Sequence, residues 1–122
     1  MAYIDIHDLE VYKLSRKLSS MAWGIYVSLP QYLKFHMGDQ LLRASDSVGA
    51  NLTEGYFRYT YKDKNKFYVI ARASHGEAFK HWMSLLLERE LISLELHDDF
   101  LATSKDLNVK LNNFITKTRD QS

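Results

Sequence analysis

The sequence predicts an all-α protein, an antiparallel up-down-up-down four-helix bundle, from three observations. One proline and five glycines among 122 residues leave few of the turn residues that β-sheet architectures need. Apolar residues recur three or four positions apart along most of the chain, which is the period of an amphipathic helix. The links between these segments are short, and short links make consecutive long helices run antiparallel.

Length and composition indicate a single domain over residues 1–122. Hydrophobic residues make up 46% of the chain and charged residues 25%, as in ordinary globular proteins. A chain of this length buries roughly two-thirds of the surface that its unfolded form exposes. One hydrophobic core is therefore expected, without help from disulfides or metal ions.

The first helix is predicted from about Asp8 to Leu29. Pro30 ends it, because a proline keeps the preceding residue out of helical angles. Residues 31–37 are expected to form the connection, with Gly38-Asp39 as the start of the next helix. The apolar stripe of the first helix consists of Val11, Leu14, Leu18, Met21 and Ile25.

The second helix is predicted from about Asp39 to Tyr59, and a capping box from Thr60 to Asp63 then begins the third. The second half of the third helix is apolar over most of its circumference, so we expect it to be the most buried helix. Its apolar positions are Phe67, Ala71, Ser74, Ala78, Phe79, Trp82, Met83, Leu85 and Leu86.

The fourth helix follows a turn at Ile92-Ser93, with Ser93 as its N-cap, and is predicted to end near Arg119. Phe100, Leu107, Leu111 and Phe114 mark its apolar face. This completes four helices and leaves no room for a second domain.

Charge and cysteine content exclude several classes of protein. Lys and Arg number 16 against 15 Asp and Glu, so a nucleic-acid partner would need a local basic patch. The absence of cysteine excludes disulfides, thiolate metal sites and cysteine nucleophiles. The N-terminal segment lacks the pattern of a secretory signal, and no apolar run is long enough to span a bilayer. We expect a cytoplasmic protein with no membrane partner.

Polar side chains follow a helical stripe on the second helix and another on the third. They could meet solvent, a partner subunit or each other, and the sequence leaves these alternatives open. If the two stripes face each other, Arg43 or Arg72 would pair with Glu54 or Glu77. The residues of the expected network or subunit contact are Gln40, Arg43, Ser47, Asn51, Glu54, Arg72, Ser74 and Glu77.

Basic and aromatic residues alternate around the turn between the second and third helices. Aromatic faces beside cationic side chains suit single-stranded nucleic acid. The alternative is that the aromatics close the end of the bundle while the lysines keep the turn solvated. The candidate contacts for RNA are Arg58, Tyr59, Tyr61, Lys62, Lys64 and Lys66.

No motif for catalysis or for a cofactor is found. Glu77 and His81 lie four positions apart, but the Glu-x-x-His pairs of di-iron bundles are missing, and so is His-Glu-x-x-His. Gly49 and Gly55 do not form a phosphate loop, since no Gly-Lys-Ser/Thr follows. We therefore expect no enzyme, cofactor or metal. No small-molecule substrate is evident, because a sequence does not display a pocket.

Two spaced motifs resemble those of a known family, the bacterial 23S ribosomal RNA intervening-sequence proteins, once labelled ribosomal protein S23. The family pattern Gln-x-x-Arg-Ala-x-x-Ser-Ile-Pro-x-Asn-Ile-Ala-Glu-Gly is similar to residues 40–55, and Ala-Arg-Gly-Ser-x-x-Glu is similar to residues 71–77. The opening at residues 8–12 also resembles the family. Gly49 replaces the usual proline, so the second helix lacks the steric clash by which a proline bends a helix.

The resemblance implies a four-helix bundle that assembles as a homopentamer, with the chain itself as its main partner. It also implies an association, in some bacteria, with inserts in ribosomal RNA genes, and no established reaction. Relatives that serve as accessory factors of retroelements engage nucleic acid through a basic surface of the pentamer. RNA contact is thus the alternative to a purely scaffolding role.

Overall fold

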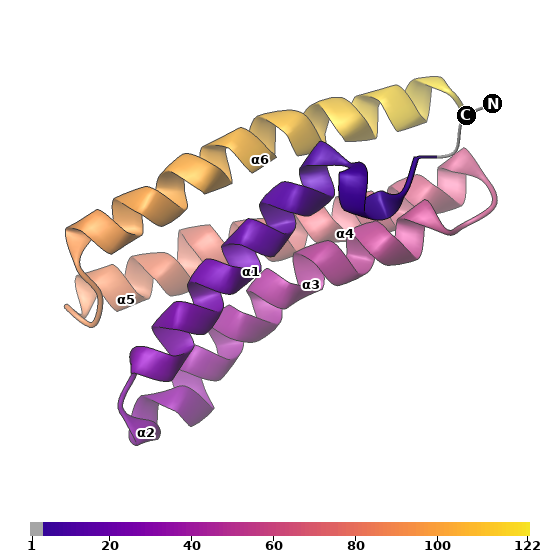
Figure 1. Ribbon diagram of the computed structural model, residues 1–122. Coiled ribbons are helices and arrows are strands. Elements are labelled where there is room, and N and C mark those ends of the chain that lie inside the picture. The colour runs from indigo at the N-terminus through magenta and orange to yellow at the C-terminus, as the bar shows by residue number, and fades with distance from the viewer. Residues whose placement is uncertain (1–3) are drawn as a thin grey trace.

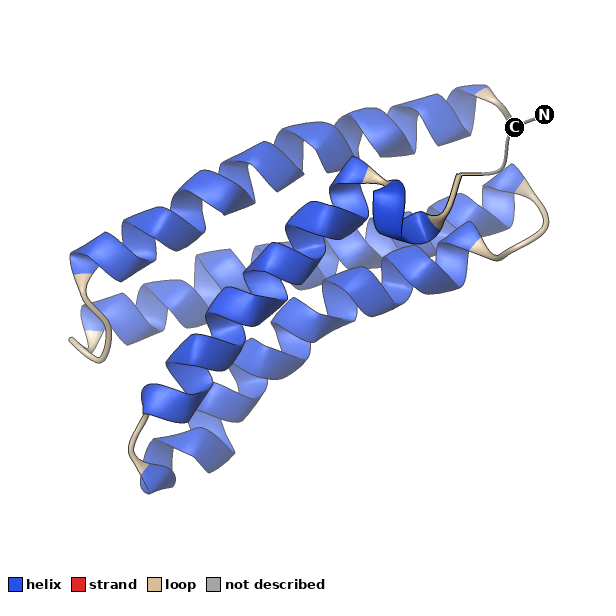
Figure 2. Ribbon diagram, in the orientation of Figure 1, coloured by secondary structure: helices blue, strands red, loops and turns tan. Residues whose placement is uncertain are grey.

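The regular secondary structure of the computed structural model, which describes residues 4–122, is entirely helical (Figure 2). Four antiparallel rods pack as the predicted four-helix bundle (Figure 1). Two rods contain a π-helical segment, and a short 3-10 helix precedes the first rod. The elements are η1 (Ile6–Asp8), α1 (Glu10–Ser28), α2 (Gln31–Leu33), η2 (Lys34–Gly38), α3 (Asp39–Tyr56), α4 (Tyr61–Gly76), η3 (Glu77–Met83), α5 (Ser84–Glu88) and α6 (Leu94–Asp120).

The first rod, α1, begins two residues later than predicted, because Leu9 has an extended backbone (φ −72°, ψ 130°) and the preceding turn is 3-10 helical. It ends as expected. Leu29, the residue before Pro30, is extended at φ −74°, ψ 150°.

The predicted connection over residues 31–37 is wrong. The chain is helical without interruption from Gln31 to Tyr56, so the second rod begins directly after Pro30. Gly38 has helical angles (φ −61°, ψ −46°) and does not mark the start of a helix. Its small size serves packing instead: a Cβ at Gly38 would lie 3.0 Å from Leu29 Cδ1 and 3.1 Å from Tyr26 Cδ2. The rod stays α-helical through Gly49 and ends at Tyr56, three residues before the predicted end.

The third rod begins at the predicted cap, where Thr60 Oγ1 accepts a hydrogen bond from the Asp63 amide at 3.1 Å. The expectation that this rod would be the most buried is wrong. Phe67, Trp82 and Leu85 are only half-buried, and α3 buries a larger share of its residues. The outer side of the third rod stays exposed because the fourth rod covers only one side of it.

The link to the fourth rod is longer than the predicted turn. The backbone leaves α5 through Glu90, which has a left-handed φ of 59°. The Leu91 amide donates to the Leu86 carbonyl at 2.9 Å and the Glu90 amide to the Leu87 carbonyl at 3.0 Å, which is a Schellman motif. Ser93 then caps α6 as predicted, with its Oγ accepting from the Leu96 amide at 3.1 Å.

The core runs the length of the bundle between the rods. The backbones of α3 and α4 come close together at Gly55. A Cβ there would lie 2.7 Å from the Lys64 carbonyl oxygen and 2.8 Å from Tyr68 Cε1. Burial raises the pKa of the Tyr68 phenol. Large side chains that are fully enclosed include Leu18, Ile25, Met37, Leu41, Leu52, Tyr68, Met83, Leu86, Phe100, Leu107 and Leu111.

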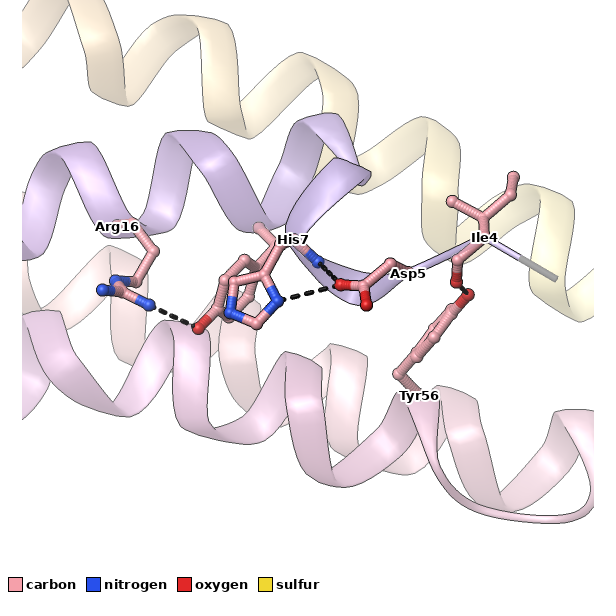
Figure 3. Close-up of polar contacts among 6 residues, drawn as sticks. Ile4, Asp5, His7, Arg16 and Tyr56 are labelled. Atoms are coloured by element: carbon pink, nitrogen blue, oxygen red, sulfur yellow. Dashed lines mark hydrogen bonds and ion pairs between the residues drawn. The ribbon is translucent and has the colours of Figure 1, made fainter.

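The start of the described chain is attached to the end of α3 (Figure 3). The Tyr56 hydroxyl donates a hydrogen bond to the Ile4 carbonyl oxygen. Asp5 Oδ1 accepts from the His7 amide at 2.8 Å and lies 2.8 Å from His7 Nδ1. The backbone hydrogen bond from His7 is the main cause of a lowered pKa of the Asp5 carboxyl. Among residues 4–122, no helix combines the length and apolar character that crossing a bilayer requires.

Candidate functional site

The polar stripe of α3 lies mostly on the outside of the single chain. Gln40, Arg43 and Glu54 are exposed, while Ser47 and Asn51 are half-buried. Arg43 Nε pairs with Asp39 Oδ2 at 3.0 Å, one turn back on the same helix. Such an exposed pair contributes about 0.3–0.5 kcal/mol, so the folded chain depends little on it.

The two polar stripes meet at a pair of serines. Ser74 Oγ, from α4, donates to Ser47 Oγ at 3.1 Å. Asn51 Nδ2 donates to the same Ser47 Oγ at 2.9 Å and to the Ser47 carbonyl oxygen at 2.8 Å. The uncharged centre of the expected network therefore exists between α3 and α4.

The expected ion pairs between the stripes are wrong. Within the described residues, no ion pair joins Arg43 or Arg72 to Glu54 or Glu77. Arg72 Nη1 donates instead to Asn112 Oδ1 of α6 at 3.0 Å, and Glu77 accepts from Trp82 Nε1 at 2.8 Å. All four of these charged side chains are exposed and do not enter the α3–α4 seam.

Some of the basic side chains of the predicted patch already have partners within the α3–α4 turn. Arg58 pairs with Glu54 at 2.5 Å, and its guanidinium carbon lies 4.7 Å from the Phe67 ring centroid. Lys64 Nζ donates to the Tyr56 carbonyl oxygen at 2.5 Å, and burial lowers the pKa of Lys64. Lys66 Nζ lies 3.6 Å from Asp63. Arg58 and Lys64 therefore hold the turn together.

Several aromatic side chains at this turn remain free for contact. Tyr59 is 98% exposed, Phe57 63% and Tyr61 41%. Tyr61, Lys62 and Lys66 line a shallow groove. Its other walls are Val69 and Ile70 of α4 and, from the far end of the sequence, Arg119 of α6. Arg119 was missed from the sequence, because only the packing of α6 on α4 brings it here.

Large side chains are also exposed on both sides of the α1–α2 connection. This connection lies at the end of the bundle opposite the α3–α4 turn (Figure 1). We refer to Trp23, Val27, Tyr32 and Phe35 as the end cluster. Their exposures are 55%, 49%, 76% and 75%. Trp23 stacks on Tyr26 with ring centroids 5.6 Å apart. The sequence pattern does not indicate this cluster, because residues 31–37 carry no helical period and resemble a connection.

A buried polar pair was also missed. His75 of α4 and Ser104 of α6 are 5% and 3% exposed, and His75 Nε2 lies 2.5 Å from Ser104 Oγ. Burial lowers the pKa of His75, which favours the neutral imidazole. One face of α6 carries residues spaced three or four positions apart: Leu101, Ser104, Lys105 and Asn108. This spacing could have indicated from the sequence that Ser104 shares a helix face with a nonpolar residue.

Metal-ligating side chains do not gather in the described part of the chain, where no group of three or more His, Asp or Glu residues is placed to hold an ion. His81 contacts Trp82 edge-on, with ring centroids 4.6 Å apart, and Glu77 is bound to the same indole. The Glu77 and His81 pair therefore serves the side-chain packing around Trp82.

The fold and these surfaces define a small antiparallel four-helix-bundle protein whose most distinctive polar motif lies on an outer face. The chain belongs to the 23S rRNA-intervening sequence protein family, whose family model matches residues 7–113. This confirms the resemblance of the sequence motifs.

A solved structure supports the same assignment. A protein of unknown function from the S23 ribosomal protein family of Bacteroides thetaiotaomicron is similar at a TM-score of 0.80 and 27% identity. The similarity covers 87% of this chain and 95% of that one. Comparison with curated proteins gave no match.

Proposed function

We propose that the protein is a homo-oligomeric scaffold without catalytic activity of its own, and that the assembly is a pentamer, as the family resemblance implies. The observation that carries this proposal is the end cluster. Its four large side chains flank one helix connection and are 49–76% exposed, and exposed nonpolar groups commonly mark a protein interface.

The polar motif of α3 supports the same proposal. Arg43 and Glu54 make only local, exposed ion pairs, so the folded single chain gains little from them. Polar and charged groups around a nonpolar contact instead set the orientation and specificity of association. We propose that the end cluster buries against a neighbouring copy, and that the contact continues along the outer face of α3, where Gln40, Arg43 and Glu54 fix its geometry.

The test is native mass spectrometry of matched variants. Trp23→Ser and Phe35→Ser should weaken association by roughly tenfold or more, because buried aromatics dominate interface energies. Arg43→Ala and Glu54→Ala should also release monomers while leaving the urea midpoint of the released chain close to that of the wild type. Leu94→Ser is the control, since Leu94 is 62% exposed but lies outside the cluster. Equal assembly of the Trp23, Phe35 and Leu94 variants would show that the end cluster is not part of the subunit contact.

A second candidate function is binding of single-stranded RNA at the α3–α4 turn. Tyr59, at the turn, is almost completely exposed, and Tyr61 lines a groove with Lys62, Lys66 and Arg119. Exposed aromatic rings beside cations suit unpaired bases and phosphates. Fluorescence anisotropy with a labelled single-stranded RNA should show salt-dependent binding that Tyr59→Ala and Lys62→Ala weaken. Lys13→Ala on α1 is the control, and absence of binding at low salt removes this candidate.

A further inference from the structure

A cavity of about 510 Å³ opens between the third and fourth rods, away from both the end cluster and the α3–α4 turn. One wall is formed by residues 72–80 of α4 and η3, and the other by residues 101–109 of α6. Its volume falls within the range of small-molecule sites, about 300–1,000 Å³. We call it the α4–α6 groove.

One wall of the groove lacks a side chain at Gly76. Gly76 lines it, and a Cβ built on Gly76 would meet nothing within 4 Å. A glycine inside a helix costs about 0.5–1 kcal/mol relative to alanine. At Gly55 the close approach of two helices explains the glycine, but no such contact requires Gly76. Gly76 therefore leaves this space open, and the glycine lowers the stability of the helix.

The inner surface of the groove is mainly nonpolar, with one polar pair. Phe79, 7% exposed, and Leu101 contribute nonpolar surface, and Val109 extends it outward at 60% exposure. His75 and Ser104 lie within the same lining and hydrogen-bond to each other. A nonpolar interior with a few polar groups is the usual character of a ligand site.

The charges around the groove have a single sign. Arg72, Lys80 and Lys105 belong to the lining, which contains no carboxylate. None of these three cations takes part in an ion pair within the described residues. Lys80 Nζ lies 5.4 Å from the Phe79 ring centroid, and Arg72 is bound to the neutral Asn112. Lys110, also on α6, is by contrast paired with Glu10 and Asp106.

We propose that the α4–α6 groove binds a small organic anion whose nonpolar body packs on Phe79, Leu101 and Val109 while its anionic group meets Arg72, Lys80 and Lys105. Each wall spans nine residues, about 12 Å of helix, which matches a small molecule better than a polymer. The π-helical segment η3 begins immediately after Gly76, and such segments often occur at functional sites. This proposal does not depend on the scaffold role.

The probe for the test is 8-anilinonaphthalene-1-sulfonate, an aromatic sulfonate, with the uncharged N-phenyl-1-naphthylamine as its matched analogue. Binding to the full chain is followed by fluorescence, and the site is located by amide chemical shifts of residues 72–80 and 101–109. Gly76→Leu fills the groove and should weaken sulfonate binding at these residues by about tenfold or more, since the nonpolar contacts are lost. Gly24→Leu on α1 is the control, because a Cβ at Gly24 also meets nothing within 4 Å.

Charge is tested separately. The double variant Lys80→Gln and Lys105→Gln should weaken binding of the sulfonate by about fivefold to tenfold and leave the neutral analogue unaffected. Lys13→Gln with Lys17→Gln on α1 is the matched control. Circular dichroism melts establish that each variant is folded. Sulfonate binding that Gly76→Leu leaves unchanged, shifts confined to residues outside the groove, or equal lysine dependence of both probes would overturn the proposal. Binding of RNA at these residues without sulfonate binding would also overturn it.

Discussion

His75 is the clearest case of a residue whose environment changes its chemistry. Because burial lowers its pKa below the ordinary 6.5, the unfolded chain takes up a proton at mildly acidic pH more readily than the folded chain does. The charged residues lining the same groove, Arg72, Lys80 and Lys105, are cations and do not favour the imidazolium. The stabilisation from a neutral His75 is therefore complete above about pH 6.5 and is lost as the pH falls toward the lowered pKa.

We predict that the free energy of unfolding falls below pH 6.5, by up to about 1.4 kcal/mol per pH unit while His75 is charged only in the unfolded chain. Urea denaturation between pH 5 and 8 measures this. The variant His75→Gln keeps a hydrogen-bonding group for Ser104 and should flatten the dependence. The same slope in both proteins would show that His75 is not its source.

Glu90 is a residue with an unfavourable backbone. Its φ of 59° lies in the left-handed region, which is the position of the glycine in a typical Schellman motif. We predict that Glu90→Gly raises the free energy of unfolding by about 0.5–1 kcal/mol, measured by urea denaturation. Glu88→Gly, still inside α5, is the comparison and should lower it. A destabilised Glu90→Gly protein would mean that the Glu90 side chain contributes more than its backbone costs.

Sequence reasoning succeeded at the residue scale where the interaction is local. The caps at Thr60 and Ser93 join groups three positions apart, and the sequence displays such pairs directly. His75 and Ser104 are 29 positions apart, so only the packing of two helices brings them together. Glu90 gave no signal, since a left-handed position is normally indicated by glycine or asparagine.

Glycines determine how closely the helical elements approach. At Gly55, α3 and α4 come so near that a Cβ would be within 3.0 Å of the Lys64 backbone, the Tyr68 ring and Phe67. We predict that Gly55→Ala lowers the free energy of unfolding by about 1–3 kcal/mol, because the helix backbones must move apart. Gly24→Ala should raise it by about 0.5–1 kcal/mol, since its Cβ would enter open space.

Chemical denaturation of the two variants beside the wild type measures both effects. Equal stability of the Gly55→Ala protein would mean that the α3–α4 seam accepts a side chain at this position. The comparison is well matched, because both glycines lie inside helices and only their surroundings differ.

At the scale of elements, four helices could be predicted because each has a clear nonpolar period, and the ends at Leu29 and Ser93 have local signals. The start of the second rod could not. Gly38-Asp39 has the composition of a helix start, but Gly38 is buried against Tyr26 and Leu29, so tertiary packing explains the glycine. The buried fraction of the third rod was overestimated for a related reason. Nonpolar residues around a whole helix do not show which of them the neighbouring rods cover.

The whole molecule presents three separate surfaces: the end cluster, the aromatic turn between α3 and α4, and the α4–α6 groove. The spacing of the polar stripes pointed to α3 and α4 and predicted that Ser47 and Ser74 belong to one hydrogen-bonded network. The sequence could not show that Lys80 and Lys105 lie beside Arg72 in the α4–α6 groove, because Lys80 and Lys105 belong to different rods. The end cluster depends on residues 31–37 being helical, which no local pattern indicated.

The central claim is that copies of this chain associate through the outer surface that the single bundle leaves uncovered. Sedimentation velocity of the full chain over a range of micromolar concentrations, at moderate salt, tests it most directly. We predict one dominant species of five times the chain mass of 14.3 kDa. A species of 14.3 kDa at every concentration would contradict it.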